Sequence, residues 1–417
     1  MAIDRLTVST VPGLIDALSG AGGAADILIE GRLRGVPPLT LPGGVALHGA
    51  GPGAALVFDQ GGDGLRLTRD NRVGGLRLET APAARAIHND TAVDTLGTLE
   101  LREVSTVGRV ELLARERVRA GHVRVDGLDI EAADARECLP RPRGYNVEVI
   151  QGAFTLYNQQ TDPAALITCE LTGLTAGRDG APVRGGGVFV SGTDGGGRVT
   201  GERLHTGPVF SDGGIPAGTP GQISGGVFVV YASVREVVNH GPVTTYGVND
   251  MVLDLWGEVG SWTAHAPITS YGPSGIGFVL FGTLRRLAVH APIETFGLGA
   301  RAFNVYDGTV ETAEFDRIVT HADAAVGIQI SKPVGTITVR RGIETHGASG
   351  ESLVKGELMT LAATALSLKP GARARLVRVD GGITTHGPGT PAVEVLGSVG
   401  ELDINGPITT RDPSPDG

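Results

Sequence analysis

Aromatic residues make up only 4% of this 417-residue sequence, and there are only two cysteines. Cys138 and Cys169 do not stand in a CxxC or another metal-ligand spacing, so we expect neither a disulfide framework nor a zinc site. No apolar run reaches 18 residues, which argues against a membrane-spanning helix. The first residues, MAIDRLTVST, lack the charged and apolar regions of a secretory signal. The sequence as it stands therefore predicts a cytoplasmic protein, or a secreted one if a leader preceded it.

Basic residues are fewer than acidic residues in this sequence. The net charge is −10 and the isoelectric point is about 5.5. Proteins that bind nucleic acid or anionic membranes are usually basic, so we expect neither as a partner. No glycine-rich phosphate loop, Walker motif or GxSxG elbow is present, and we therefore predict no nucleotide, no metal and no other cofactor.

Glycine, by contrast, is abundant. The 66 glycines are more than twice the ordinary usage, but they follow no three-residue period, which excludes collagen. Interior glycine also disfavours helices.

Three related segments recur at intervals of 25 residues: HGPVTTYG (240–247), HAPITSYG (265–272) and HAPIETFG (290–297).

The same interval aligns short, alternating apolar segments, which indicate strands. One column of positions contains Phe228, Leu253, Phe278, Phe303 and Ile328. Short strands, glycine turns and one coil per ~25 residues predict a parallel β-helix. The coil is too long for the left-handed hexapeptide type, so we predict an all-β, right-handed solenoid. We assign residues 1–25 to an N-terminal cap, 26–410 to a single β-helix and 411–417 to a flexible tail.

The N-terminal region favours the same architecture. TVPGLIDALSG (10–20) is the best short helix candidate, and a helix there would cover the open apolar end of a solenoid. It precedes ADILIEG (25–31) and GVALHGAG (44–51). This order resembles the start of the pectate-lyase-like right-handed β-helix superfamily, which implies carbohydrate chemistry. The NTD, DD and GHG segments of polygalacturonase-like hydrolases are missing, so the resemblance carries over no catalytic residue.

Three longer segments interrupt the repeat before residue 226, all at the same predicted corner. They are 137–146, 176–185 and 211–223. Insertions at one corner of a solenoid commonly build the walls of a binding face. We therefore expect the neighbouring strands to carry the functional site, although tolerated surface loops are the alternative.

The outward positions of those strands supply the candidate binding residues. If Phe228, Leu253 and Phe278 point inward, alternate residues point outward. The outward positions hold an aromatic row beside amide side chains, and the substrate-binding candidates are Trp256, Tyr306, Asn304, Gln329, Tyr231 and Tyr157. An exposed aromatic row marks an interaction surface, either for an oligo- or polysaccharide or, alternatively, for a dimer or trimer of this chain.

Asp254 is the carboxylate on the middle of this face, with Asp212 and Asp307 as candidate partners. Glycoside hydrolysis needs two carboxylates about 5–10 Å apart. The sequence therefore predicts a carbohydrate-active enzyme, a glycoside hydrolase or transglycosylase with these three catalytic candidates. A polysaccharide lyase or epimerase is one alternative, and a non-catalytic glycan-binding or oligomeric structural β-helix is another.

Histidines occupy two further columns. His321, His346 and His386 continue the positions of Tyr246, Tyr271 and Phe296, and the column of His240, His265 and His290 continues into Phe315 and Arg340. Because these positions exchange His for other residue types, we predict ring stacking at the corners of the coils and not metal binding.

Overall fold

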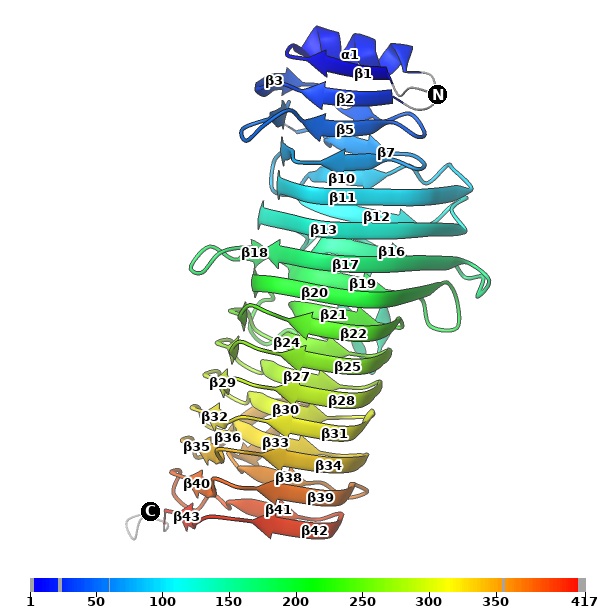
Figure 1. Cartoon of the computed structure of the whole chain (residues 1–417). Coiled ribbons are helices and arrows are strands. Elements are labelled where there is room, and N and C mark those ends of the chain that lie inside the picture. The colour runs from blue at the N-terminus through cyan, green and yellow to red at the C-terminus, as the bar shows by residue number, and fades with distance from the viewer. Residues whose placement is uncertain (1–3, 22–24, 60, 355–356, 412–417) are drawn as a thin grey trace. The chain divides into compact units, whose positions relative to one another are not determined.

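The computed structural model describes residues 4–21, 25–59, 61–354 and 357–411. The residues of the predicted tail beyond Arg411 lie outside this part. Contacts divide the chain into two compact units, which are described separately. The first contains residues 1–137, 151–207 and 231–233, and the second contains 138–150, 208–230 and 234–417. Both are built from short parallel strands that stack in successive coils (Figure 1), which confirms the predicted parallel β-helix.

The first unit begins with β1 (Asp4–Val8) and α1 (Val11–Gly20). The Thr10 side chain accepts a hydrogen bond from the Gly13 amide at 3.2 Å, an N-terminal cap that satisfies one unpaired donor of the helix. Leu14 and Leu18 are the buried residues of the helix, and α1 contacts β1 and β3 (Arg32–Val36). The predicted helix at residues 10–20 is therefore confirmed.

The strands of the first unit form three rows. One row contains β4 (Leu39–Thr40), β7 (Leu65–Leu67), β10 (Arg85–Asn89), β12 (Arg109–Ala114), β16 (Gly152–Asn158) and β19 (Gly186–Ser191). The second row begins with β1 and continues through β2 (Ala25–Ile29), β5 (Ala46–Gly49) and β8 (Arg72–Gly74). The third row begins with β3, β6 (Ala55–Phe58) and β9 (Arg77–Glu79). These two rows merge in the long strands β11 (Thr95–Val107), β13 (Ala120–Ala132) and β17 (Leu166–Ala176), because β11 pairs with both β8 and β9. The short β18 (Val183–Arg184) follows β17, and β20 (Arg198–Asp212) continues from this unit into the second.

The second unit repeats three strands per coil. The first row contains β21 (Gln222–Val230), β24 (Asp250–Leu255), β27 (Ile276–Leu280), β30 (Arg301–Val305), β33 (Val326–Ile330), β38 (Leu366–Leu368) and β41 (Val393–Val395). The second contains β22 (Ser233–Asn239), β25 (Glu258–Ala264), β28 (Thr283–Val289), β31 (Thr309–Phe315), β34 (Pro333–Val339), β39 (Arg373–Val379) and β42 (Ser398–Ile404). The third contains β23 (Val243–Thr245), β26 (Ile268–Ser270), β29 (Ile293–Thr295), β32 (Ile318–Thr320), β35 (Ile343–Thr345), β40 (Ile383–Thr385) and β43 (Ile408–Thr410).

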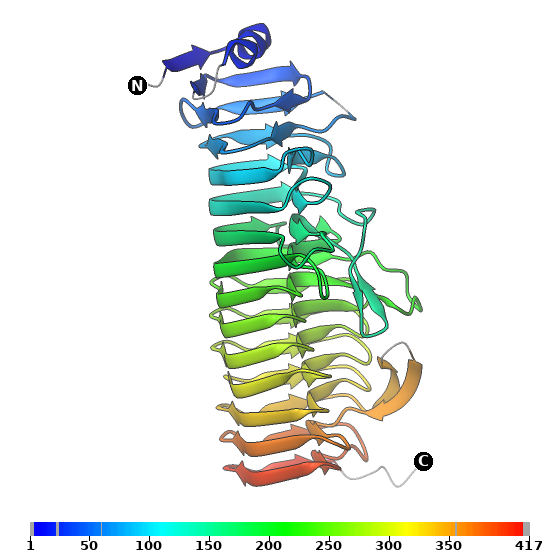
Figure 2. The same ribbon diagram turned by 90° about the vertical axis from the view of Figure 1, so that its right-hand side faces the viewer.

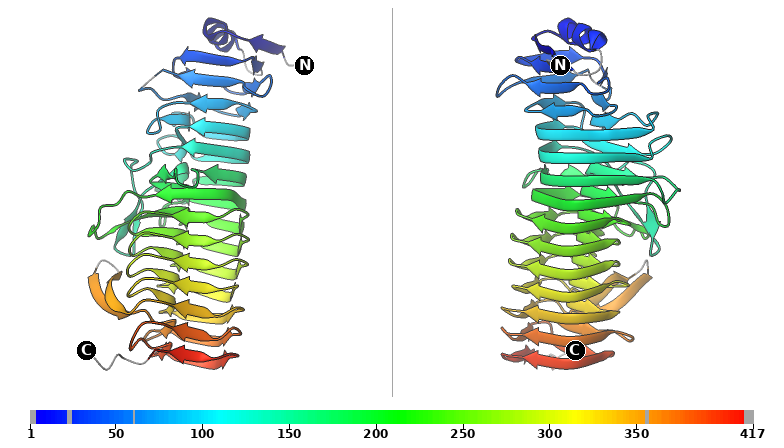
Figure 3. Two further views of the ribbon diagram at one scale, coloured as in Figure 1. Left: turned by 90° about the vertical axis from the view of Figure 1, so that its left-hand side faces the viewer. Right: turned by 45° about the vertical axis from the view of Figure 1, so that its right-hand side comes forward.

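Two hairpins depart from this plan. One contains β14 (Arg143–Gly144) and β15 (Val147–Val149), and the other β36 (Ser349–Val354) and β37 (Glu357–Ala362). β15 pairs in parallel with β21 at the edge of the first row. Both hairpins leave the stacked coils on the same side (Figure 2), and the left view of Figure 3 agrees.

The register of the first row confirms most of the predicted column. Leu253, Phe278, Phe303 and Ile328 are direct partners in successive coils. Phe228 is the exception, because it pairs with Asp254 while Val227 pairs with Leu253. Val229 pairs with Leu255 and Val243 with Ile268, so one additional residue lies between Val229 and Val243. Tyr231 is therefore one residue beyond the position in register with Trp256.

The core of the second unit is packed around fully buried aromatic rings. Trp262 meets Phe278 edge-on with ring centroids 5.0 Å apart, and Phe303 lies 4.9 Å from Phe315. The Trp262 indole donates a hydrogen bond to Asn239 Oδ1 at 2.8 Å, so its polar atom is satisfied inside the core. The rings come from strands of the first and second rows and meet in the interior between them.

The predicted stacking of rings at the corners is also confirmed. Tyr246, Tyr271, Phe296, His321, His346 and His386 stack in sequence with centroids 4.3–5.4 Å apart. The three histidines His240, His265 and His290 form a second stack. Each ring covers the corresponding ring of the next coil, which is the geometry that a repeating corner imposes.

Close stacking of coils makes certain glycines indispensable. A Cβ atom on Gly49 would lie 2.1 Å from the Gly75 carbonyl oxygen of the next coil, whereas one on Gly51 would meet no heavy atom within 4 Å. We therefore expect Gly49→Ala to lower the free energy of unfolding by at least about 2 kcal/mol, and Gly51→Ala to change it by less than about 0.5 kcal/mol. Denaturant unfolding of both variants measures this difference. Equal stabilities would show that the two coils are not held at this spacing.

Candidate functional site

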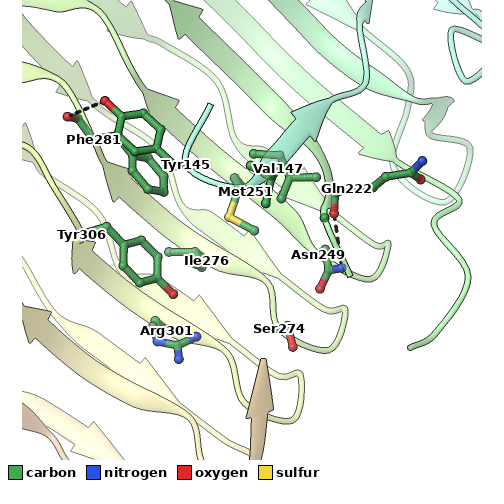
Figure 4. Close-up of a pocket in the computed structure, with 12 residues that line it drawn as sticks. Tyr145, Val147, Gln222, Asn249, Met251, Ser274, Ile276, Phe281, Arg301 and Tyr306 are labelled. Carbon is green, nitrogen blue, oxygen red and sulfur yellow. Dashed lines mark hydrogen bonds between the residues drawn. The ribbon is translucent and has the colours of Figure 1, made fainter. Parts of the chain in front are cut away.

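A small pocket lies on the outer side of the first row in the second unit (Figure 4). Its walls come from the first-row strands, from the β14–β15 hairpin and from the segment that leads into β21. The lining residues are Tyr145, Val147, Gly221, Gln222, Ile223, Asn249, Met251, Ser274, Ile276, Phe281, Arg301 and Tyr306. Segments 137–146 and 211–223 thus contribute to its walls, as expected for insertions at that corner.

Tyr145 covers one end of the pocket. Its ring stacks on Phe281 with centroids 4.4 Å apart and meets Trp256 edge-on at 5.1 Å. Tyr145 has a φ of 51° and Asn146 one of 67°, and this left-handed pair turns the hairpin back towards β21. The packed ring explains why Trp256 is only 4% exposed.

Polar contacts of Glu148 hold the hairpin in place. Glu148 Oε1 accepts hydrogen bonds from Arg141 Nη1 and Gln222 Nε2, both at 2.9 Å. Burial acts to raise the pKa of Glu148, but the hydrogen bonds from Arg141 and Gln222 outweigh it, so the pKa lies below its ordinary value. Tyr145 is therefore positioned by an ionised anchor.

Arg301 is the one charged side chain among the lining residues. It follows Met251 and Ile276 in register and precedes Val326, so it interrupts an apolar column. Its guanidinium is buried. Nη1 donates to the Gly299 carbonyl at 3.2 Å and Nη2 to Ser352 Oγ at 3.0 Å. Within the described chain Arg301 forms no ion pair, and its buried Nε has no hydrogen-bond partner.

Asp254 lies on the same outer side, beside Trp256. Its side chain has no exposed surface, and Oδ2 accepts a hydrogen bond from Trp256 Nε1 at 3.0 Å. Oδ1 has no hydrogen-bond partner among the described residues. Burial raises the pKa of Asp254 well above its ordinary value, and the Trp256 hydrogen bond offsets this only in part. Asp254 therefore favours the neutral, protonated form.

The other predicted carboxylates occupy different surroundings. Asp212 Oδ1 accepts a hydrogen bond from the Gly214 amide at 2.8 Å, which closes a local turn. Asp307 pairs with Lys332 Nζ at 3.4 Å. Asn304 and Gln329 continue the column of Asp254 through Val279, and both are buried.

The aromatic row is not exposed, contrary to expectation. Tyr306 is 7% exposed and lines the pocket, and its ring stacks on Phe281 at 5.2 Å. Tyr157 and Tyr231 belong to the first unit. Tyr157 is 6% exposed, pairs in register with Ser191 and contacts the Phe189 ring at 5.9 Å.

Sequence reasoning did not single out Tyr145 or Met251 as site residues. It marked the segment around Tyr145 as an insertion, but no repeat predicts which side chain of an insertion folds back onto the coils. Met251 and Ile276 sit at positions that otherwise resemble ordinary strand residues. Arg301 carries the clearest signal available, because it is a charge in an apolar column.

The fold and the pocket together define a parallel β-helix protein with an aromatic pocket built around a buried arginine. No protein-family model, curated protein or solved structure matches the chain. No helix in the described part of the chain is long and apolar enough to cross a membrane.

Cys138 and Cys169 are buried thiols, and burial raises the pKa of Cys169 to about 12.

The raised pKa of Asp254 predicts a pH-dependent stability. Below pH ~3.8 the carboxyl is protonated in both states. At higher pH the unfolded chain ionises while the folded chain keeps its proton. Stability therefore falls with rising pH until the folded pKa is passed, by about 1.4 kcal/mol for each unit of pKa elevation.

We expect Asp254→Asn to remove this loss, so that the variant gains stability over the parent as the pH rises from 4 to 8. Thermal unfolding across this range measures the difference. Val279, the partner of Asp254 in register, has no titratable group, so Val279→Ala serves as the control and should differ from the parent by the same amount at every pH. A constant difference between parent and Asp254→Asn at every pH would contradict the assignment.

Proposed function

We propose that the second unit binds an acidic sugar residue of a glycan, with the sugar carboxylate held at Arg301. One observation carries this proposal: a guanidinium buried in an apolar pocket without an acidic partner among the described residues. A buried charge is costly unless it is paired, and arginine cannot release its proton at physiological pH. A carboxylate from a ligand supplies the missing partner.

Unsatisfied polar atoms on the same side of the row support a polar ligand. Asp254 Oδ1, Arg301 Nε and both amide atoms of Asn304 are buried without a hydrogen-bond partner in the described part of the chain. Bound water or a ligand commonly satisfies such atoms.

The size of the pocket limits what enters it. Its volume is about 60 Å³, and a single water needs roughly 10–15 Å³ on this measure. The inner part therefore admits the carboxylate-bearing edge of a sugar, while the rest of the residue lies at the mouth. There the rings of Tyr145 and Tyr306 offer flat apolar surfaces, and Gln222 and Ser274 offer polar groups. The resemblance to the pectate-lyase-like superfamily also supports a carbohydrate ligand.

Glucuronate and glucose provide a matched pair of probes for this proposal. We expect the protein to bind glucuronate at least ~10-fold more tightly than glucose, because a charge-assisted hydrogen bond contributes about 1.5–3 kcal/mol. Arg301→Met should abolish the preference, while Met251→Leu in the same column should retain it. Titration calorimetry measures the four affinities. Equal binding of the two sugars by the parent protein would overturn the proposal, and a preference for benzoate over both would point to an aromatic acid.

The glycoside hydrolase predicted from the sequence is a second candidate function. The observation that favours it is the raised pKa of Asp254, since a general acid must hold its proton near neutral pH. The Asp254 carboxyl is fully buried and accepts a hydrogen bond from Trp256, so catalysis would require the surrounding side chains to move. Neither Asp212 nor Asp307 is joined to Asp254 by the hydrogen bonds described above.

Catalysis by Asp254 is tested with a panel of neutral and acidic polysaccharides and a reducing-sugar assay. We expect Asp254→Asn to lower the rate on any cleaved glycan by at least ~100-fold. Full activity in the variant would exclude Asp254 as the acid. A product that absorbs in the near ultraviolet would identify the lyase alternative.

A further inference from the structure

The corner stack of the second unit ends in two histidines that converge on one carboxylate. His386 Nε2 lies 2.9 Å from Glu344 Oε1, and His346 Nε2 lies 3.4 Å from the same oxygen. In the described part of the chain, these are the only three His, Cys, Asp or Glu side chains whose ligand atoms all approach within 4.8 Å of one another. We propose that Glu344, His346 and His386 form a binding site for a zinc ion.

The separations suit zinc coordination. Zinc binds imidazole nitrogen and carboxylate oxygen at about 2.0–2.2 Å, so two ligand atoms of a tetrahedral site are about 3.3 Å apart. The two nitrogen–oxygen distances here bracket that value. Two imidazoles and one carboxylate are also a ligand set that zinc uses in proteins, and the fourth position would remain open to water.

The ring stack and an arginine arrange these side chains around Glu344. The rings of His346 and His386 are parallel within 4° with centroids 4.5 Å apart, and His346 stacks in turn on His321. Because an imidazole binds a metal in its own ring plane, the His386 ring, whose side chain is 46% exposed, must turn out of the stack when both Nε2 atoms bind one ion. Arg317 Nη2 binds the second carboxylate oxygen, Glu344 Oε2, and so leaves Oε1 directed towards the imidazoles. A partner of this kind orients a metal-binding carboxylate in the second shell of many sites.

The site is accessible and joins two coils. The His346 and His386 side chains are 37% and 46% exposed, so an ion enters without local unfolding. Glu344 lies in β35 and His346 follows it, whereas His386 follows β40. The partners Ile343 and Ile383 are 40 positions apart, and the segment between them includes the β36–β37 hairpin, whose Ser352 binds Arg301. Zinc would therefore tie together the two coils between which this hairpin is inserted.

The sequence pattern argued for stacking at these positions, because Tyr and Phe occupy the same column. The structure confirms the stack and also shows where it changes. A neighbouring column runs through β26, β29 and β35. It holds Thr269 in β26, Glu294 in β29 and, two coils further on, Glu344 in β35. His321 Nε2 meets Glu294 Oε1 at 2.8 Å. Histidines thus occur where a carboxylate stands within reach.

Zinc titration of the untagged full-length protein, freed of metal with a chelator, tests the site. We expect one zinc ion per chain, with an affinity that His386→Asn lowers by at least ~100-fold, as for loss of a primary ligand. His265→Asn, which changes a histidine in the other corner stack, should retain the parent affinity within ~3-fold. Thermal unfolding without metal verifies that both variants are folded.

Cobalt substitution of the parent protein gives a readout that needs no variant. A tetrahedral site of this composition predicts visible absorption bands much stronger than those of the hexaaquo ion, and zinc should displace them. The proposal is overturned by equal zinc affinity of parent and His386→Asn, by the absence of calorimetric binding at millimolar zinc, or by a cobalt spectrum of the aquo type.

Discussion

Parallel pairing of backbone strands between successive coils is the constraint on which the structure depends. It holds coils about 4.8 Å apart and places the same position of each coil above the next. A side chain at such a position must therefore pack against the equivalent side chains of the neighbouring coils. Leu253, Phe278 and Phe303 pack in this way in the core, and the stacked rings do so at a corner. A residue that breaks its column, as Arg301 does between Ile276 and Val326, is therefore conspicuous.

The candidate pocket lies where the regular coil is interrupted. The β14–β15 and β36–β37 hairpins leave the pairing of the first row intact, yet they supply Tyr145 and Ser352 to the neighbourhood of the pocket. The stacked coils act as a rigid support, and the hairpins decide what the outer side of that support presents. This division is common in solenoids, in which insertions at one corner line a binding face.

Two buried ionisable groups on this side meet the cost of burial in different ways. Asp254 can take up a proton, and burial raises its pKa accordingly. Arg301 cannot become neutral, so it relies on hydrogen bonds to the Gly299 carbonyl and to Ser352. These contacts leave Nε without a hydrogen-bond partner among the described residues, and the proposal of a bound carboxylate therefore rests on the arginine.

The 25-residue repeat was enough to predict the parallel β-helix, the strands and the stacked corners, and the capping helix at residues 10–20 could be predicted from its local pattern. The register at Phe228 could not, because one additional residue between Val229 and Val243 shifts the pairing by one position. The exposure of Trp256 was also mispredicted, since its cover is Tyr145, more than 100 residues earlier in the chain.

The sequence by itself determined the period of the coil and the columns that this period produces, because alternation and glycine spacing are local and are repeated many times. Only the tertiary structure decided that Tyr145 packs over one end of the pocket and that Arg301 has no acidic partner among the residues that the structure describes. It also decided that His346 and His386 meet at Glu344. Those contacts depend on insertions and on side-chain directions that occur only once in the chain. A feature that is not repeated gives the sequence no periodic signal from which the contact could be predicted.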